Sequence, residues 1–194
     1  MADEVGNGRK ASSLQVTRRI MGVDPGSIVT GWGVIETARG GLVHIDHGTI
    51  GASRSDGMGR RLSQIYHGLL EVVSRYKPQG VSLEKVFFAR NAQSALKLGH
   101  ARGVALLAVA ESHIDLYEYS TAEIKQAVVG YGQATKEQVQ TMVASLLHLS
   151  GRLPGDASDA LAAAICYLHQ QPFHSRIMRA LPGGSQEAAR WKIR

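Results

Sequence analysis

The sequence predicts an α/β fold in which helices flank a five-stranded mixed sheet. Three strand patterns follow one another near the beginning of the chain, helical and strand patterns then alternate, and the last third is mainly helical. A meander of strands followed by alternating helices and strands is typical of a mixed sheet packed between helices.

The strand predictions rest on short apolar runs that end in turn residues. The first run stops at Asp24-Pro25-Gly26, and Arg39-Gly40-Gly41 is suited to a hairpin between the second and third strands. The predicted strands cover residues 20–23, 30–37, 42–50, 80–84 and 114–119.

The helix predictions rest on apolar periodicity and on capping residues. Residues 58–76 carry apolar side chains at helical spacing, and residues 91–111 are rich in Ala, Leu and Gly. Ser120 with Glu123, and Thr135 with Gln138, form capping boxes that predict two further helix starts. A last helix is predicted from near Asp156 to about residue 170.

At 194 residues the chain is expected to form one domain with tails. We expect the domain to cover residues 18–171. Residues 1–17 are polar and unpatterned, which predicts a disordered N-terminal extension. Residues 172–194 carry five basic side chains against Glu187 alone, which predicts a flexible basic tail.

Charge and cysteine usage limit the partners and the compartment. The net charge of +6 and pI of about 9.7 favour a polyanionic partner, either nucleic acid or an anionic membrane face. Cys166 is the single cysteine and falls in an apolar run, so we expect an inert core thiol in a reducing cytosol. Because no segment resembles a signal peptide or a membrane span, the sequence predicts a soluble, cytoplasmic protein.

Two carboxylates stand at the ends of predicted strands. Asp24 ends a strand that reads as buried, where an acid needs a cation, a helix N-terminus or a proton. Glu84 ends the fourth strand in the same way. Taken singly, each has a plainer explanation, since Asp-Pro-Gly is ordinary turn chemistry and Glu84 could be a solvated strand end.

Two more carboxylates, Asp156 and Asp159, lie three residues apart at the start of the last helix, and so share one helix face. The structural alternative is that Asp156 is the N-cap and Asp159 complements the helix dipole. However, the alanines at 157, 160 and 162–164 are small enough to let this helix approach the sheet closely.

Four carboxylates in one place would repel each other unless cations lie between them. The ends of adjacent parallel strands meet at one edge of a sheet, where α/β sites form. Magnesium accepts carboxylate and phosphate oxygens, and two such ions about 4 Å apart can activate water against a phosphodiester. Asp24, Glu84, Asp156 and Asp159 therefore indicate metal-assisted phosphodiester hydrolysis.

With these residues in view, the sequence from Arg19 to about His169 resembles the RuvC family of Holliday-junction resolvases. The resemblance is carried by several stretches that occur in the family's order. They are residues 20–27 (IMGVDPGS), 30–33 (TGWG), 83–88 (LEKVFF), Asn91, 94–99 (SALKLG), 101–104 (ARGV), 125–126 (KQ), 128–130 (VVG) and 156–162 (DASDALA).

The resemblance implies an RNase H-like fold and a homodimer in which each subunit nicks one strand of a four-way junction. It places the family's four catalytic, metal-binding acids at Asp24, Glu84, Asp156 and Asp159. It also implies Mg²⁺ as cofactor, with Mn²⁺ as a substitute. The implied partners are a junction-binding RuvA-type protein and a hexameric RuvB-type ATPase. The leader before Arg19 is longer than usual for the family.

Several residues are candidates for contact with DNA. Between Lys85 and Ala110 the charged residues are all basic (Lys85, Arg90, Lys97 and Arg102), which suits either a phosphate-binding face or a solvated helix. The resemblance implies that Phe87 contacts a base and that Lys125 and Lys136 lie near the cut strand, whereas Phe88 could be core or exposed.

A stripe of small and apolar residues follows the predicted helix at 91–111. It could pack on the sheet or on a second subunit, and the resemblance favours pairing across a two-fold axis. Its members are Ala92, Ala95, Leu96, Gly99, Gly103, Val104 and Leu107.

Two other classes of function fit part of the pattern. An Asp-x-Gly sequence at a first strand also opens the phosphate loop of actin-like ATPases and sugar kinases, but those folds need a far longer chain. A non-catalytic binder of structured nucleic acid would not require all four acids.

Overall fold

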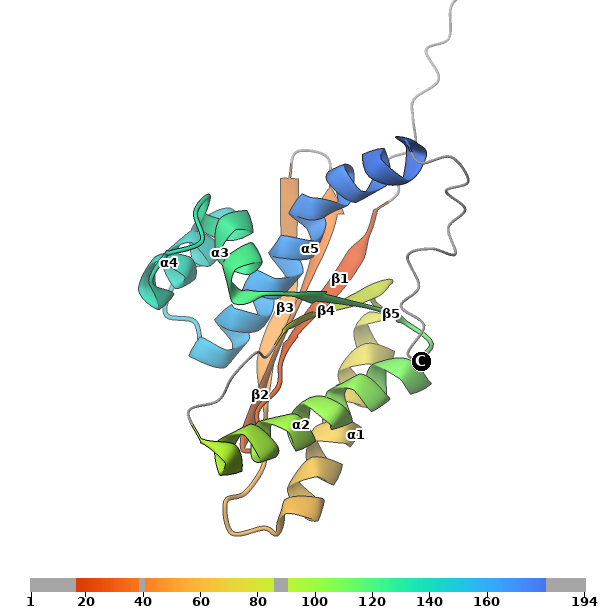
Figure 1. Ribbon diagram of the computed structural model, residues 1–194, viewed down its shortest axis with the longest axis vertical. Helices are drawn as coiled ribbons and strands as arrows, with labels where there is room; N and C mark the ends of the chain where they lie inside the picture. The colour runs from red at the N-terminus through yellow and green to blue at the C-terminus, as the bar shows by residue number, and fades with distance from the viewer. Residues whose placement is uncertain (1–16, 39–40, 86–90, 181–194) are drawn as a thin grey trace, which may run out of the picture.

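The computed structural model describes residues 17–38, 41–85 and 91–180, and for residues 171–180 it describes the backbone alone. Its centre is a five-stranded sheet with the strand order β3-β2-β1-β4-β5 (Figure 1). The predicted α/β fold and all five predicted strands are confirmed. The strands are β1 (Arg19–Asp24), β2 (Val29–Ala38), β3 (Gly41–Gly51), β4 (Gly80–Glu84) and β5 (Asp115–Tyr119).

The sheet is mixed, as expected. Strand β1 is antiparallel to β2 and parallel to β4, and β4 is parallel to β5. Because Val23 of β1 is paired with Leu83 of β4, the next residues along these two strands, Asp24 and Glu84, lie at the same edge of the sheet. The register thus brings two of the predicted site residues to neighbouring positions.

Helices cover both faces of the sheet (Figure 1). One apolar cluster joins α1 and α2 to side chains such as Met21 and Val81, and a second joins α3, α4 and α5 to Ile20 and Ile35. Adjacent residues of β1 therefore point into opposite cores, as alternation along a strand requires. The helices are α1 (Met58–Tyr76), α2 (Ala92–Glu111), α3 (Thr121–Val129), α4 (Lys136–Leu146) and α5 (Gly155–Ala180).

Side chains cap the N-termini of α2, α3 and α4, and the caps of α3 and α4 are those that the sequence predicts. Both capping boxes are present, because Ser120 and Thr135 accept hydrogen bonds from the backbone of Glu123 and Gln138, whose side chains bond back to the caps. The Asn91 side chain caps α2 by accepting from the Ser94 backbone N–H. These caps satisfy backbone donors that the first helical turn leaves unpaired.

Helix α5 is longer than predicted. It continues to Ala180, about ten residues past the predicted end and beyond the boundary at residue 171. The predicted tail begins at Pro172, a residue type that commonly ends a helix because it lacks a backbone N–H. The first part of the predicted tail, residues 172–180, is thus helical, whereas residues 1–16 and 181–194 lie outside the described part of the chain.

Glycines allow α5 to lie directly against the sheet. A Cβ atom at Gly22 would lie 1.8 Å from the backbone oxygen of Ala160, and one at Gly31 would lie 2.0 Å from the backbone oxygen of Asp156. The facing stretch of α5, residues 160–168, is buried and includes the free Cys166 in the core, as predicted. Glycine on the strands and alanine on the helix thus produce an unusually close helix–sheet contact.

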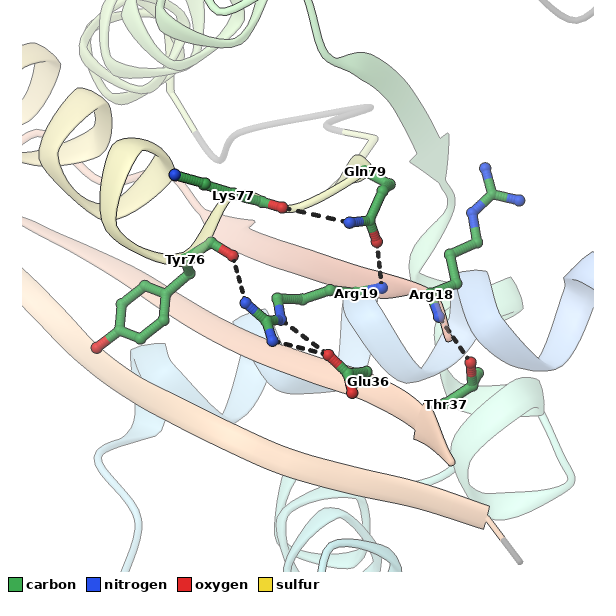
Figure 2. A network of polar contacts seen from close by, with 7 residues as sticks. All are labelled: Arg18, Arg19, Glu36, Thr37, Tyr76, Lys77 and Gln79. Atoms are coloured by element: carbon green, nitrogen blue, oxygen red, sulfur yellow. Dashed lines mark hydrogen bonds and ion pairs between the residues drawn. The ribbon is translucent and has the colours of Figure 1, made fainter. Parts of the chain in front are cut away.

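A polar network fixes the start of β1 (Figure 2). Asp24 is at the other end of the same strand. The Arg19 guanidinium pairs with Glu36 of β2 at 2.8 Å and donates to the Tyr76 carbonyl at the end of α1 at 2.7 Å. The Arg19 backbone N–H donates to the Gln79 side chain just before β4. Arg19 thereby ties β1 to β2, α1 and the loop before β4, which holds the register of the central strands.

Among the helices that the structure describes, none is both long enough and apolar enough to cross a membrane.

The contact between Gly31 and α5 gives a testable expectation. We expect Gly31→Ala to lower the free energy of unfolding by about 1–3 kcal/mol, because the new methyl group forces α5 away from β2. Chemical denaturation followed by circular dichroism measures the change. Gly51→Ala is the control, since a Cβ on that β3 residue meets nothing within 4 Å. Equal stability of the two variants would contradict the close packing.

Candidate active site at one edge of the sheet

Asp24 and Glu84 form the strand-borne half of the candidate site. Each is the last residue of its strand, and the parallel pairing of β1 with β4 places them on neighbouring strands. Both side chains are partly buried. Beyond Asp24 the chain turns tightly, and the Thr30 hydroxyl both accepts from the Gly26 N–H and donates to the Gly26 carbonyl. The turn explanation for Asp24 therefore holds for the backbone, while its carboxylate remains at the sheet edge.

Asp156 and Asp159 form the helix-borne half. Gly31 is the register partner of Asp24, and the Asp156 carbonyl lies directly over Gly31. The first turn of α5 is therefore held beside the end of β1. Helix α5 begins at Gly155, so Asp156 lies inside the first turn, and the alternative that it is the N-cap is wrong.

The electrostatics of Asp24 show that the four carboxylates influence one another. Burial, followed by repulsion from Asp159, Asp156 and Glu84, raises the pKa of Asp24 to about 7, and Lys136 partly opposes this. An aspartate pKa is near 4 in water, so the Asp24 carboxyl holds a proton at pH values where ordinary aspartates are charged. The structure thus brings together all four acids that the sequence predicts.

Two of the four carboxylates already have a partner. Lys136, the first residue of α4, donates from its ammonium to Asp159 over 2.6 Å, and the pair raises the pKa of Lys136. Thr121, the first residue of α3, donates from its hydroxyl to Oε1 of Glu84. These contacts offset part of the repulsion among the acids.

The site has the chemistry of a divalent-cation site but not a finished ligand shell. Among the residues that the structure describes, no three His, Cys, Asp or Glu side chains are grouped closely enough to hold a metal ion. The donors are all carboxylate oxygens, which suit Mg²⁺, and burial together with repulsion among the acids raises the pKa of Asp24.

Arg102 has a structural role that differs from the one expected. It was grouped with the basic residues that could follow DNA phosphates, but its side chain is mostly buried and forms an ion pair with Glu118 of β5. It also donates to the backbone carbonyl of Glu84 over 2.6 Å. Arg102 is therefore committed to the ends of β4 and β5, and the expectation of a phosphate-facing side chain is wrong.

The remaining DNA-contact candidates are only partly described. Lys97 is exposed on α2, Lys125 is half-buried on α3, and Lys136 contacts Asp159 at the site itself. Phe87 and Arg90 lie outside the described residues, as does Phe88, so the structure does not test their roles.

Thr121 and Arg102 are contacts that the sequence reasoning missed. One signal pointed to Thr121. It follows the last residue of β5 by two positions, and β5 ends beside the end of β4, where Glu84 lies. The choice of Thr121 or Arg102 as the partner of Glu84 still depends on side-chain geometry that no spacing rule provides.

The stripe on α2 is directed away from the sheet over much of its length. Leu96 is 59% exposed and Leu107 is 50% exposed, and Cβ atoms on Gly99 and Gly103 would meet nothing within 4 Å. Different residues of α2, such as Ala101 and Ala105, face the core instead. Packing of the stripe on its own sheet, one of the two alternatives, is therefore wrong for these four residues.

Sequence comparison identifies close relatives of this chain. A family model described as crossover junction endodeoxyribonuclease RuvC matches residues 20–167. A RuvC protein of Syntrophotalea carbinolica is 52% identical over 78% of this chain and 94% of its own length. A RuvC protein of Geobacter sulfurreducens is 47% identical over 84% of this chain and 99% of its own length.

Solved structures agree with the sequence comparison. The Thermus thermophilus RuvC structure determined in complex with a Holliday junction substrate is 31% identical, covers 81% of this chain and 97% of its own, and superposes with a TM-score of 0.77. The yeast mitochondrial resolvase Ydc2 shares the fold with a TM-score of 0.60 at 11% identity. The RNase H-like fold is thus confirmed, and the chain belongs to the RuvC family of crossover junction endodeoxyribonucleases.

Proposed function

We propose that this chain resolves Holliday junctions by metal-dependent hydrolysis, with Asp24, Glu84, Asp156 and Asp159 as the metal-binding, catalytic residues. The observation that carries the residue assignment is the strand register, which brings Asp24 and Glu84 to one sheet edge while the first turn of α5 lies over Gly31, the partner of Asp24. The pKa of Asp24, raised by burial and by the three other acids, is consistent with it. Membership of a nuclease family supports the reaction. A cluster of carboxylates at one sheet edge, without a local need in the fold, is most simply explained by a cation that neutralises it.

The carboxylates would hold the cation, and the nearby Lys136 would compensate negative charge on the substrate phosphate. When bound, two Mg²⁺ ions would supply an activated water and stabilise the leaving oxygen of the phosphodiester, and Mn²⁺ could replace them. Asp24, the most strongly affected acid, would release its proton as the cation binds. Lys136 would then be able to turn from Asp159 toward a phosphate oxygen, since the ion replaces it as the partner of that carboxylate.

We further propose that DNA is held by basic residues around this edge of the sheet. Lys97, Lys125 and Lys136 would contact phosphates, and Arg90, which lies outside the described residues, would add a further basic contact. Phe87 would stack on a base near the junction, because it follows Glu84 by three residues and aromatic rings bind unpaired bases. Any such contact adds to the general attraction of the chain's positive charge for DNA.

A homodimer formed through α2 would give symmetric cutting. The exposed stripe around Leu96 and Leu107 combines two large apolar side chains with glycines, which allow two helices to approach closely. A two-fold axis through this surface would relate two identical sites, one for each nick. The proposed assembly acts in the cytoplasm together with RuvA-type and RuvB-type branch-migration proteins in recombination and repair.

The first prediction from the proposed function concerns catalysis. Asp24→Asn is expected to reduce Mg²⁺-dependent cutting of a synthetic four-way junction at least about 100-fold, because the proposed metal site loses a carboxylate ligand. This factor corresponds to about 3 kcal/mol of lost transition-state stabilisation. Junction binding should persist, since the substitution removes negative charge. Gel assays of cutting and of binding measure both. Asp115→Asn, at the exposed start of β5, is the control. Full cutting by Asp24→Asn would refute the assignment.

The second prediction concerns pH and stability without metal. Because the Asp24 pKa is higher in the folded state (about 7) than in the unfolded state, folded protein binds the extra proton and loses stability as the pH rises from about 4 to 7. The Asp24→Asn variant does not lose this stability, because an asparagine side chain does not ionise. Its stability relative to the original protein should therefore increase by about 1–3 kcal/mol between pH 5 and pH 8 in EDTA.

Urea denaturation across this pH range measures the difference, and Asp115→Asn is again the control. Adding Mg²⁺ at pH 8 should stabilise the original protein more than Asp24→Asn, since the ion replaces the proton as the compensating charge. A stability difference that does not change with pH would show that the Asp24 carboxyl is ionised throughout.

The third prediction concerns the dimer. Leu107→Lys should give a monomer in light-scattering measurements, because a pair of ammonium groups at a two-fold contact is desolvated and self-repelling. Val43→Lys is the matched control, since Val43 is 43% exposed on the edge strand β3. A dimer that persists in Leu107→Lys, or an original protein that is monomeric at assay concentration, would exclude α2 as the interface.

A further inference from the structure

Glu84 is fixed at three points, and only one of them involves its carboxylate. Its backbone is paired with Tyr119 in the ladder between β4 and β5. Its carbonyl accepts a hydrogen bond from Arg102 at 2.6 Å. Its carboxylate oxygen Oε1 accepts from the hydroxyl of Thr121. The first two contacts place the residue, and the third selects the direction in which the side chain points.

Thr121 is itself held rigidly. It is the first residue of α3, immediately after the N-cap Ser120, whose backbone and side chain bond with Glu123 in the capping box. A threonine side chain has two heavy atoms on Cβ, so its hydroxyl has few orientations available. The donor that meets Glu84 is therefore fixed relative to the end of β5, and hence relative to the sheet edge.

We propose that Thr121 is a positioning residue that holds the Glu84 carboxylate for the metal ion. This inference rests on the proposed function. A carboxylate can accept a hydrogen bond and bind a cation at the same time, and metal-binding carboxylates are usually oriented by such partners. A glutamate without a partner loses more side-chain freedom on binding an ion, so the Thr121 contact favours metal binding by supplying that order in advance.

A purely structural role for the contact is the competing explanation. Thr121 is exposed, so its hydroxyl has water as an alternative partner and the bond contributes little to folding. The Ser120 capping box and the β4–β5 ladder both remain without it. Thr121→Val, which replaces the hydroxyl by a methyl group of similar size, therefore separates metal positioning from stability.

The test measures Mn²⁺ binding to the full chain by calorimetry in the absence of DNA. Thr121→Val is expected to weaken the binding about tenfold, as loss of an outer partner of a metal ligand does, and Thr121→Ser is expected to restore it. The Mg²⁺ concentration that gives half-maximal junction cutting should rise in parallel. The matched control is Thr141→Val, because the hydroxyl of this exposed helical threonine bonds to the Glu137 backbone carbonyl.

The Glu84→Gln variant distinguishes an error in the proposed metal site from an error in the role of Thr121. If Glu84→Gln binds Mn²⁺ and cuts like the original protein, the proposed site itself is wrong. If Glu84→Gln loses both properties while Thr121→Val retains the original affinity, only the role of Thr121 is wrong. Thermal unfolding in EDTA completes the test, since a large drop for Thr121→Val that Thr141→Val does not share would mean that the contact serves the fold.

Discussion

The direct contact between helix α5 and the glycines of the central strands is the constraint on which the rest of the molecule depends. Gly22, Gly31 and Gly33 leave room for the α5 backbone and the Leu161 side chain. A larger residue at any of these positions would push the helix outward. The contact buries the alanine-rich part of α5 and also places the first turn of the helix beside the end of β1, so core packing and site assembly share one cause.

This placement has an electrostatic cost that the fold only partly relieves. Burial of Asp24 and repulsion from the three other acids together raise the pKa of its carboxyl. Lys136 compensates Asp159, and Thr121 donates to Glu84, but neither contact removes the excess negative charge. Selection for stability alone would not keep four acids in this arrangement, since replacing one by an uncharged residue relieves the repulsion. The arrangement is consistent with a site kept for binding a cation.

The sequence was sufficient for features that depend on local pattern. Strand alternation, the two capping boxes and the acids at strand ends were all predicted, because periodicity and cap chemistry act over a few residues. It was insufficient where tertiary contacts decide. Arg102 resembles a surface cation in sequence, but its partners Glu84 and Glu118 come from two different strands. Pro172 similarly suggests a helix end, although α5 continues past it.

The contacts of the four acids suggest how the site can be assembled without being rigid throughout. The Glu84 backbone is fixed by a strand ladder and by Arg102, whereas Asp159 is held by a lysine whose side chain is largely exposed. A long exposed lysine exchanges partners at little cost, since surface ion pairs contribute only about 0–1 kcal/mol. The strand-borne side of the site is therefore preorganised, and the helix-borne side can adjust when a cation or a phosphate replaces Lys136 beside Asp159.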